Sequence, residues 1–388
     1  MYCAGRKALA VMLTVGCFVP LLTSCGTAPV GGGSTVDSTH SHTTTQEATT
    51  VTTKTEPTTT TIGSSVSVDH TTSASFSSHT RTSVTTKRST TVTTTSKAPV
   101  TTTTATALPE PWFTGPAVTS KTSIKVLAIG NSYSVNAMKY LYELLKTGGY
   151  ETVVLGNLFI PGCALDTHEQ NMQKNLPEYI YYFNDDGRWV PRPNYTVSKA
   201  LASEEWDVVT LQQASFKSGL PTSYAPLPRI LDYLEEHRPA AHTRFVWHQT
   251  WAYQTNFPSQ DFARYESDQM TMYEYIVSAI RWKVIPETRI TAVIPSGTAI
   301  QNLRSSQIGD TLNVDGTHLT EGLGCYTASM AWYCALTGKS ADTVTWTPDG
   351  QEVAPWLGAV QEAVRNALAI PDAVTPSVDY APQSKDLL

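Results

Sequence analysis

The chain has 388 residues, with 27 Lys and Arg against 33 Asp and Glu, which gives a formal net charge of -6. This length is enough for one large folded domain, and the acidic balance argues against a protein that binds nucleic acid through its overall charge. The first quarter of the chain differs sharply in composition from the remainder.

The amino-terminal segment has the layout of a secretory signal. Arg6 and Lys7 precede an apolar run over residues 8–22, which is too short for a stable membrane-spanning helix. The tetrapeptide LTSC, which ends at Cys25, resembles the lipobox of bacterial lipoproteins. That resemblance implies a signal peptide over residues 1–24, a lipid on Cys25 and an anchor on the outer face of a bacterial cell. The alternative is a plain signal with an incidental cysteine, and both readings predict an exported protein.

Residues 25–120 are predicted to form a disordered linker. From residue 31 to about residue 107, Thr and Ser dominate, and no periodicity gives a helix or strand a face to bury. A random coil of about 80 residues spans roughly 50 Å. We therefore expect a tether that holds a folded domain, residues 121–370, away from its anchor, with a C-terminal tail over residues 371–388.

Apolar patterns in the expected domain alternate between strand and helix. Five runs of strand length lie at residues 124–129, 152–160, 206–211, 245–247 and 290–294. Helical spacing appears at residues 135–145, after Gly162, and at residues 224–237, 265–282 and 320–336. An aromatic hairpin that turns at residues 184–187 is predicted over residues 179–196. The alternation predicts an α/β domain in which a parallel sheet lies between helices.

Small or polar residues follow all five predicted strands. The strand ends read Gly130-Asn131-Ser132, Pro161-Gly162-Cys163, Gln212-Gln213, His248-Gln249 and Ser296-Gly297. In open α/β sheets, ligands bind beyond the carboxyl ends of the strands. We therefore expect a site at this edge, although loop composition alone would produce part of the pattern.

The stretch NVDGTHLT, residues 313–320, adds an acid and a base to that edge. Asp315 lies three residues before His318, so one loop can present the imidazole while its own carboxylate orients the ring. A serine hydroxyl needs such an oriented base to act as a nucleophile. Ser132 thereby gains a partner 186 positions away. The alternative is that Asp315 only caps the helix that follows.

These motifs resemble a known superfamily. GNSYS at residues 130–134 resembles the first block of the GDSL, or SGNH, hydrolases, Gly162 their second-block glycine, and DGTHLT their Asp-x-x-His block. The strings GNLFIPGCALDTH, WDVVTLQQAS, WHQTWAY and IPSGTAIQN are similar to an uncharacterised bacterial family of that superfamily, DUF4886. The resemblance extends from about residue 125 to residue 338.

The resemblance implies both a fold and a chemistry. The fold would be a flavodoxin-like three-layer sandwich with a five-stranded parallel sheet. The chemistry would be that of a serine hydrolase that needs no metal and no cofactor. Ser132 would be the nucleophile, His318 the general base and Asp315 its orienting group, while the backbone N–H groups of Ser132 and Gly162 would hold the oxyanion.

Two positions depart from the superfamily's motifs. The first block usually has Asp before the serine, and this chain has Asn131. The third block usually supplies an asparagine to the oxyanion hole, and the matching strand end here has Gln212 and Gln213. We favour Gln213 as the replacement donor. Gln212 is expected to face the sheet's packing, because neighbouring strand residues point to opposite sides.

Other polar and aromatic residues are weaker candidates. Gln212 and His248 could contact substrate, and a core histidine is the alternative for His248. His168 is either a group behind the site or a residue of a helix surface. The aromatic residues of the hairpin could stack on a sugar ring or simply pack on their own domain: Tyr181, Tyr182, Phe183 and Trp189.

The cysteines carry no predicted chemistry. After removal of the signal and lipidation of Cys25, Cys163, Cys325 and Cys334 remain, an odd number that excludes complete internal pairing. Cys325 and Cys334 are too far apart along one helix to bond to each other. They show no metal-ligand spacing, and the sequence places no histidine to activate Cys163.

The resemblance to the SGNH hydrolases, together with the expected display on a long stalk, implies an O-acyl, most simply O-acetyl, esterase that acts on carbohydrate outside the cell. Its partners would be an acylated glycan or another small ester and, through the lipid, a membrane, with no nucleic acid and no metal. The alternative is a non-catalytic glycan-binding lipoprotein that keeps the fold, which the missing third-block asparagine suggests. A lipase would need an exposed apolar lid, and no amphipathic insertion of that kind is evident in the sequence.

Overall fold

The computed structural model describes Trp112, residues 117–120 and residues 122–383. The predicted signal peptide, the lipid site at Cys25 and most of the predicted linker lie outside the described residues. The end of that linker packs on the domain: Trp112, Ala117 and Val118 are buried, and the Val118 N–H donates to the Leu336 carbonyl at 2.9 Å.

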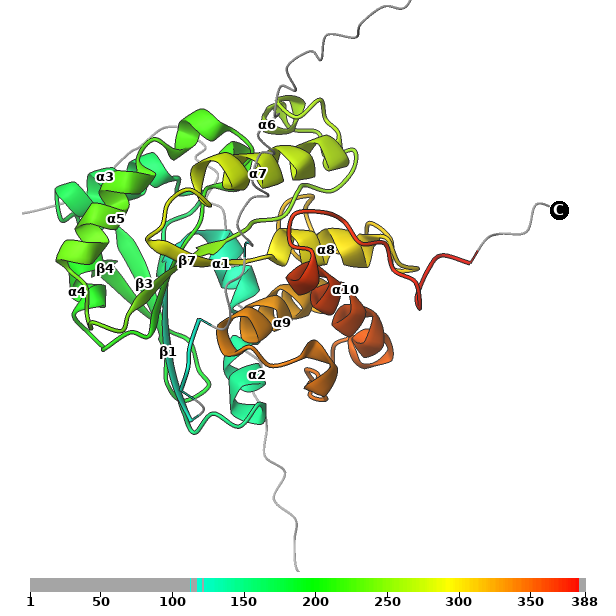
Figure 1. The fold of residues 1–388 in the computed structure, drawn as a ribbon, viewed down its shortest axis with the longest axis horizontal. Helices are drawn as coiled ribbons and strands as arrows, with labels where there is room; N and C mark the ends of the chain where they lie inside the picture. Colours follow the sequence, from blue (N-terminus) through cyan, green and yellow to red (C-terminus); the bar gives the residue numbers. More distant parts are fainter. Residues whose placement is uncertain (1–111, 113–116, 121, 384–388) are drawn as a thin grey trace, which may run out of the picture. The chain divides into compact units, whose positions relative to one another are not determined.

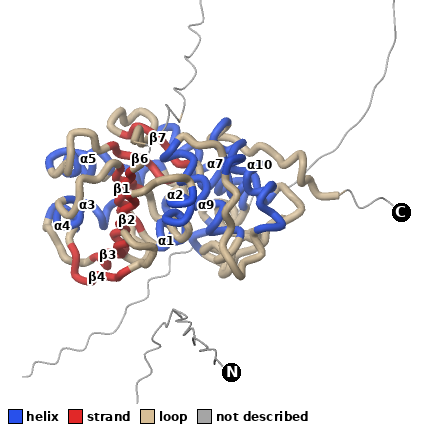
Figure 2. Tube along the Cα trace, turned by 90° about the horizontal axis from the view of Figure 1, so that it is seen from below, coloured by secondary structure: helices blue, strands red, loops and turns tan. Residues whose placement is uncertain are grey.

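Five strands form the parallel part of the sheet, and each overlaps one of the predicted strands. They are β1 (Ser123–Gly130), β2 (Thr152–Phe159), β5 (Val208–Leu211), β6 (Arg244–His248) and β7 (Ile290–Ile294). Their spatial order is β2-β1-β5-β6-β7, which is the flavodoxin-like order. Figure 2 shows the strands following one another across the domain. This confirms an α/β fold with a largely parallel sheet.

The prediction of a purely parallel, five-stranded sheet was wrong. The aromatic hairpin forms β3 (Tyr179–Asn184) and β4 (Val190–Tyr195) and extends the sheet beyond β2 in antiparallel fashion, giving seven strands. Alternate residues of β3, among them Tyr179 and Tyr181, are buried against the domain. Pro191 and Pro193 on β4 suit an outermost strand, because proline cannot donate to a further neighbour.

Helices cover both faces of the sheet. In Figure 1, α3 (Leu165–Gln173), α4 (Val197–Leu201) and α5 (Leu227–Glu236) lie on one side, opposite α1 (Ser132–Ala137), α2 (Leu141–Thr147) and α9 (Leu323–Thr337). The helices α8 (Ser296–Arg304) and α10 (Leu357–Ala369) pack beside α9, and α6 (Gln260–Ala263) and α7 (Gln269–Lys283) connect β6 to β7. Short 3-10 turns occupy residues 215–217, 221–224, 341–343 and 354–356.

The predicted helix over residues 135–145 is divided between α1 and α2. Ser329 of α9 accounts for the break, because its hydroxyl donates to the Ala137 carbonyl at 2.8 Å and accepts from the Tyr140 N–H at 3.1 Å. One side chain thus satisfies two backbone groups that an unbroken helix would pair internally. The sequence did not predict α4, α6, α8 or α10.

The described part of the predicted tail is attached to the domain. The Thr375 N–H donates to the Asn302 side chain at 2.8 Å, and the Val378 N–H donates to the Glu362 carboxylate at 2.8 Å. Among the described residues, no helix combines the length and apolar character that a membrane span requires.

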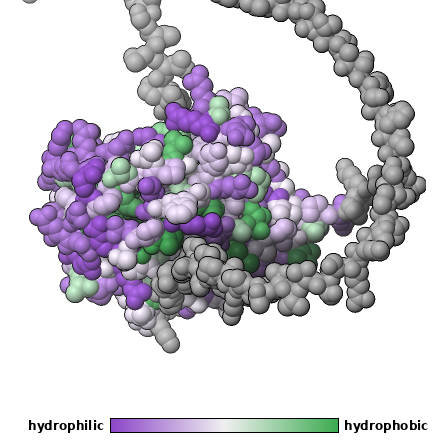
Figure 3. Space-filling model, turned by 45° about the horizontal axis from the view of Figure 1, so that its top comes forward, coloured by the Kyte–Doolittle hydropathy of each residue, from purple (hydrophilic) through white to green (hydrophobic). Residues whose placement is uncertain are grey.

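The face in Figure 3 is mostly polar, with small apolar areas. The exposed large apolar residues of the described chain are Val135, Val190, Met270, Tyr275, Trp282, Val314, Ile370 and Val378.

Candidate active site

Ser132 is the first residue of α1, directly beyond the end of β1. Asn131 caps this helix, because its Oδ1 accepts a hydrogen bond from the Tyr133 N–H at 3.0 Å. Gly130 allows the close packing of the turn, since a Cβ there would lie 2.5 Å from the Ser134 Oγ. The strand, the glycine and the cap therefore present the partly buried Ser132 side chain at the carboxyl edge of the sheet.

Three side chains form one hydrogen-bonded row at this edge. The Ser132 Oγ lies 2.8 Å from the His318 Nε2, and the His318 Nδ1 lies 2.6 Å from the Asp315 Oδ2. Folding thus brings together the three residues that the sequence paired, although Ser132 and His318 are 186 positions apart. Hydroxyl, imidazole and carboxylate in this order are the arrangement that activates a serine.

The charge of Asp315 determines which ring nitrogen of His318 carries a proton. Burial raises the pKa of Asp315, but hydrogen bonds from the His318 ring and from the His318 and Thr317 backbone outweigh burial and hold the pKa well below its usual range. The carboxylate is therefore ionised at neutral pH and only accepts hydrogen bonds. The His318 Nδ1 must carry a proton, which leaves the lone pair of Nε2 directed at Ser132.

The loop over residues 313–319 is held as a compact unit. Asn313 and Leu319 form an antiparallel bridge, and the Leu319 N–H donates to the Asn136 side chain of α1 at 3.0 Å. Gly316 has φ +86°, and a Cβ there would clash with the ring of Phe257. The loop is thereby fixed both to the helix that carries Ser132 and to the chain that follows β6.

The buried side chain of Arg304 stabilises this loop. The sequence did not predict this role. The side chain is only 3% exposed and pairs with Asp310 at 3.0 Å. It also donates to the Asn313 Oδ1 at 2.6 Å and to the Ala252 carbonyl at 3.1 Å. Burial lowers the pKa of Arg304 to about 10, so the guanidinium stays charged at neutral pH. The available sequence signal was a charged residue at the end of a segment, SGTAIQNLR, that carries no other charge.

The turn after β2 follows the strand that pairs with β1. Gly162 is exposed and has φ +60°, a conformation that favours glycine. The Asn131 Nδ2 donates to the carbonyl of Cys163, the next residue, at 3.0 Å. The asparagine that caps α1 therefore also fixes the glycine turn beside the serine.

The amide of Gln213, the expected replacement donor, is not available for an oxyanion. The Gln213 Nε2 donates to the carbonyl and to the hydroxyl of Ser223, at 2.9 and 3.0 Å, which uses both of its hydrogens. The Gln212 Nε2 donates to the Asn131 Oδ1 at 2.7 Å, and its Oε1 lies 2.9 Å from the Nδ1 of His248. Gln212 and His248 are both buried, so the structure places them behind the site and not on its open side.

The structure does place a histidine next to Cys163, which the sequence analysis did not expect. The Cys163 Sγ lies 3.5 Å from the Nδ1 of His168, which also lies 2.9 Å from the Tyr179 hydroxyl. Burial raises the pKa of the Cys163 thiol to about 12 and lowers that of His168 to about 4, so both groups are neutral. A buried, protonated thiol is a poor nucleophile.

The remaining cysteines and the hairpin ring of Tyr181 pack within the domain. Cys163, Cys325 and Cys334 are all free and buried. The hairpin ring of Tyr181 packs on Tyr195, with centroids 4.6 Å apart. Within the described residues, no group of three or more His, Cys, Asp or Glu side chains could hold a metal.

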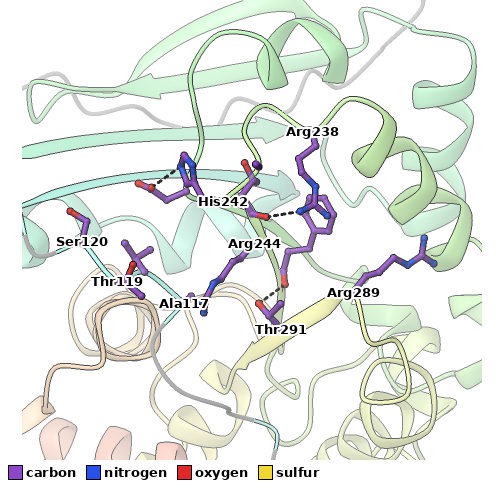
Figure 4. Close-up of a pocket in the computed structure, with 13 residues that line it drawn as sticks. Ala117, Thr119, Ser120, Arg238, His242, Arg244, Arg289 and Thr291 are labelled. Carbon is purple, nitrogen blue, oxygen red and sulfur yellow. Dashed lines mark hydrogen bonds and ion pairs between the residues drawn. The ribbon is translucent and has the colours of Figure 1, made fainter.

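A cavity of about 450 Å³ lies at the opposite, amino edge of the sheet (Figure 4). Its charged lining residues pair with one another or with neighbours: His242 lies 3.3 Å from Asp207, and Arg289 lies 2.8 Å from Glu287. Residues 117–120, where the chain enters the domain, form one of its walls. It is separate from the row at Ser132.

Comparisons with known proteins place this architecture in a family. Residues 125–356 match the model of the family described as Domain of unknown function (DUF4886). The chain belongs to this family. A crystal structure of a DUF4886 family protein from Bacteroides uniformis ATCC 8492 is 43% identical, covers 66% of this chain and 99% of that chain, and has a TM-score of 0.63. The family resemblance of the sequence is thus confirmed.

More distant matches are found among other solved structures. A protein from Slackia heliotrinireducens, described as a proposed SGNH hydrolase, is 20% identical, with coverage of 55% and 99% of the two chains and a TM-score of 0.37. A mutant of the acetylxylan esterase Axe2 from Geobacillus stearothermophilus is 11% identical, with coverage of 60% and 100% and a TM-score of 0.38. These likenesses are too remote to assign an activity. No curated protein matches the chain.

Proposed function

We propose that the domain is a serine esterase in which Ser132, His318 and Asp315 act as the catalytic residues. The observation that carries the proposal is the row itself, with 2.8 Å between the Ser132 Oγ and the His318 Nε2 and 2.6 Å between the His318 Nδ1 and the Asp315 Oδ2. Both distances lie within the reach of proton transfer and orientation that a serine nucleophile needs.

The reaction begins with attack of the Ser132 Oγ on the ester carbonyl carbon while the His318 Nε2 takes the hydroxyl proton. The carbonyl oxygen becomes an oxyanion that the backbone N–H groups of Ser132 and Gly162 stabilise. His318 then protonates the leaving alcohol as its bond to the acyl carbon breaks. A water molecule, deprotonated by His318, hydrolyses the acyl-serine and restores the hydroxyl. Gln213 has no part in this scheme, because Ser223 binds its amide.

The surroundings of Ser132 favour a small acyl group on a polar alcohol. Among the described residues, the exposed large apolar side chains next to the row are two separate valines, Val135 and Val314, which do not form the lid of a lipase. Beyond Gly162, Asp166 pairs with Lys217 at 2.6 Å and makes a charged rim. An O-acetyl group on carbohydrate is the substrate class that fits these features.

The alternative is a glycan-binding protein that retains the fold without catalysis. The observation that favours it is the engagement of Gln213, which leaves the oxyanion without the third side-chain donor that the SGNH motif would supply. Two backbone donors remain, and removal of one donor in such a site costs about 10²- to 10³-fold in rate. The missing third donor therefore favours a slower enzyme over a protein without catalysis.

The decisive assay is acetate release from acetylated xylan and from acetylated sialosides by the wild-type chain and by Ser132→Ala. The proposal expects acetate from at least one of the two with the wild type and none with the variant. Binding of a glycan without acetate release would favour the alternative. Equal release by Ser132→Ala would remove Ser132 from the mechanism.

We also propose that the protein is exported and anchored through a lipid on Cys25, which would bring the domain to carbohydrate outside the cell. The charged start, short apolar run and LTSC tetrapeptide support this location. Cells fed a labelled fatty acid should label the wild-type chain and not Cys25→Ala; equal labelling of both would contradict the anchor.

A further inference from the structure

A buried row of hydrogen bonds crosses the carboxyl edge of the sheet behind Ser132. It begins at the Cys163 carbonyl after β2 and passes through Asn131 after β1 and Gln212 after β5 to His248 at the end of β6. These strands are consecutive neighbours in the sheet. The exposed fractions of Asn131, Gln212 and His248 are 2, 2 and 1%.

The backbone fixes the direction of this row. The Tyr133 N–H can only donate, so it requires the Oδ1 of Asn131; the Cys163 carbonyl can only accept, so it requires the Nδ2. Gln212 must then offer its Nε2 to the Asn131 Oδ1, which turns its Oε1 toward His248. His248 can satisfy that oxygen only as the Nδ1–H tautomer. Each amide orientation therefore follows from the one before it.

His248 is suited to end the row as a neutral donor. Burial lowers its pKa to about 3, so the ring carries no charge at neutral pH. It is packed against Trp332 in an edge-on contact, with centroids 5.0 Å apart, which restricts its rotation. A flipped ring would leave the Gln212 Oε1 buried without a donor, which carries an energetic penalty.

We propose that Gln212 and His248 are positioning residues for the oxyanion hole. Acting through Asn131, they hold the Gly162-Cys163 turn against the first turn of α1, so that the backbone N–H groups of Ser132 and Gly162 converge on the same oxygen. This inference rests on the proposed esterase function. It also explains Asn131, because an ionised aspartate would present an oxygen to the Cys163 carbonyl and could not donate to it.

The test compares ester and thionoester substrates, because a thiocarbonyl sulfur accepts hydrogen bonds poorly and gains little from an oxyanion hole. Full-length wild type, His248→Phe, Gln212→Met and His248→Asn are assayed on p-nitrophenyl acetate and its thiono analogue. Asparagine can place an N–H near the position of the histidine Nδ1, so it is the rescuing variant. Thermal melts identify any variant that does not fold.

With the wild type active, we expect His248→Phe and Gln212→Met to lower kcat for the ester about 10- to 100-fold with little change in KM. The ester-to-thionoester rate ratio should fall with them, and His248→Asn should restore both. Wild-type kcat in the folded His248→Phe or Gln212→Met variant, or a loss that leaves the ratio unchanged, would overturn the inference.

A second measurement does not depend on activity. In ¹⁵N-histidine spectra of the full chain at pH 7, the signal absent from His248→Asn should show a protonated Nδ1 and an unprotonated Nε2. The opposite tautomer or a charged ring would overturn the inference. If the wild type hydrolyses neither substrate, the esterase proposal fails, while the nitrogen shifts still decide whether the row exists.

Discussion

Asp315 determines which nitrogen of His318 carries the proton. Its Oδ1 accepts from the Thr317 and His318 backbone N–H groups at 2.9 and 2.7 Å, which leaves its Oδ2 for the ring. Both oxygens are therefore committed, and the carboxylate cannot turn away from His318. The orientation of the general base depends on one residue three positions before it.

Asp315→Asn should lower kcat for p-nitrophenyl acetate by about 10³- to 10⁴-fold with little change in KM. The amide would keep its oxygen on the two backbone N–H groups and present its NH₂ to the His318 Nδ1. That nitrogen would then have to accept, and the proton would move to Nε2, which could no longer take one from Ser132. Asp349→Asn, at an exposed residue outside the row, is the matched control and should keep wild-type rates. Equal rates in both variants would contradict the account.

Asp315 should also make stability depend on pH. Its pKa is lower in the folded protein than the value of about 3.9 expected in the unfolded chain. The stabilisation is therefore complete above the unfolded value and is lost as the pH falls through the folded one. In urea unfolding, the advantage of the wild type over Asp315→Asn should be constant at neutral pH and narrow below about pH 4. An advantage that persists undiminished at pH 3 would argue against this origin.

The row of three was predictable from the sequence because each member lies in a short motif at a strand end or in a loop. The surroundings of Gln213 were not, because its partner Ser223 lies ten residues away in a short 3-10 turn that the sequence did not predict. Cys163 and His168 are likewise brought together by the geometry of a turn and the start of a helix. No periodicity in the sequence predicts contacts of this kind.

The loop over residues 313–319 acts as one element that carries both the base and its partner. Its two ends pair with each other through Asn313 and Leu319, and Arg304 holds Asn313 from beneath. The Gly316 carbonyl accepts from the Gln254 N–H at 2.8 Å, which attaches the middle of the loop to the segment after β6. A displacement of Gly316, in the middle of the loop, should therefore also displace His318.

Gly316→Ala should lower both activity and stability, whereas Gly350→Ala should affect stability alone. Both glycines have positive φ, of 86° and 72°, so alanine carries a backbone penalty of about 1–2 kcal/mol at either position. Only at position 316 does the added Cβ also clash, with the ring of Phe257. Urea unfolding and p-nitrophenyl acetate hydrolysis measure the two effects. Unchanged kcat in Gly316→Ala would show that the loop tolerates the shift.

The five parallel strands of the sheet were predictable from the sequence, whereas the addition of the hairpin β3-β4 to the sheet was not. The apolar runs of β1, β2, β5, β6 and β7 are a direct consequence of burial on both faces. The hairpin was predictable as a hairpin, but its pairing with β2 depends on tertiary contacts that local patterns do not encode. The packed tail was missed for the same reason, whereas α10 was missed although Val360, Val364 and Ala367 recur at helical spacing.

The tail over residues 371–383 should contribute to stability. Its backbone is bound by Asn302 and Glu362, and Asp372 pairs with Arg281 at 2.6 Å. A chain that ends at Ile370 should therefore have a free energy of unfolding about 2–4 kcal/mol lower than the full chain, from several hydrogen bonds of about 1 kcal/mol each. A chain that ends at Gln383 is the control and should match the full chain. Equal free energies of unfolding for the full chain and both shortened chains would show that the tail does not stabilise the domain.

The proposed catalysis depends on the reactivity of the Ser132 hydroxyl at the rim of the sheet. Intact-mass analysis after treatment with a fluorophosphonate measures this reactivity directly, without knowledge of the substrate. We predict a single adduct on the wild type that maps to Ser132 and is absent from Ser132→Ala. A wild-type chain that remains unmodified, or an adduct of equal yield on Ser132→Ala, would show that Ser132 is not an activated nucleophile.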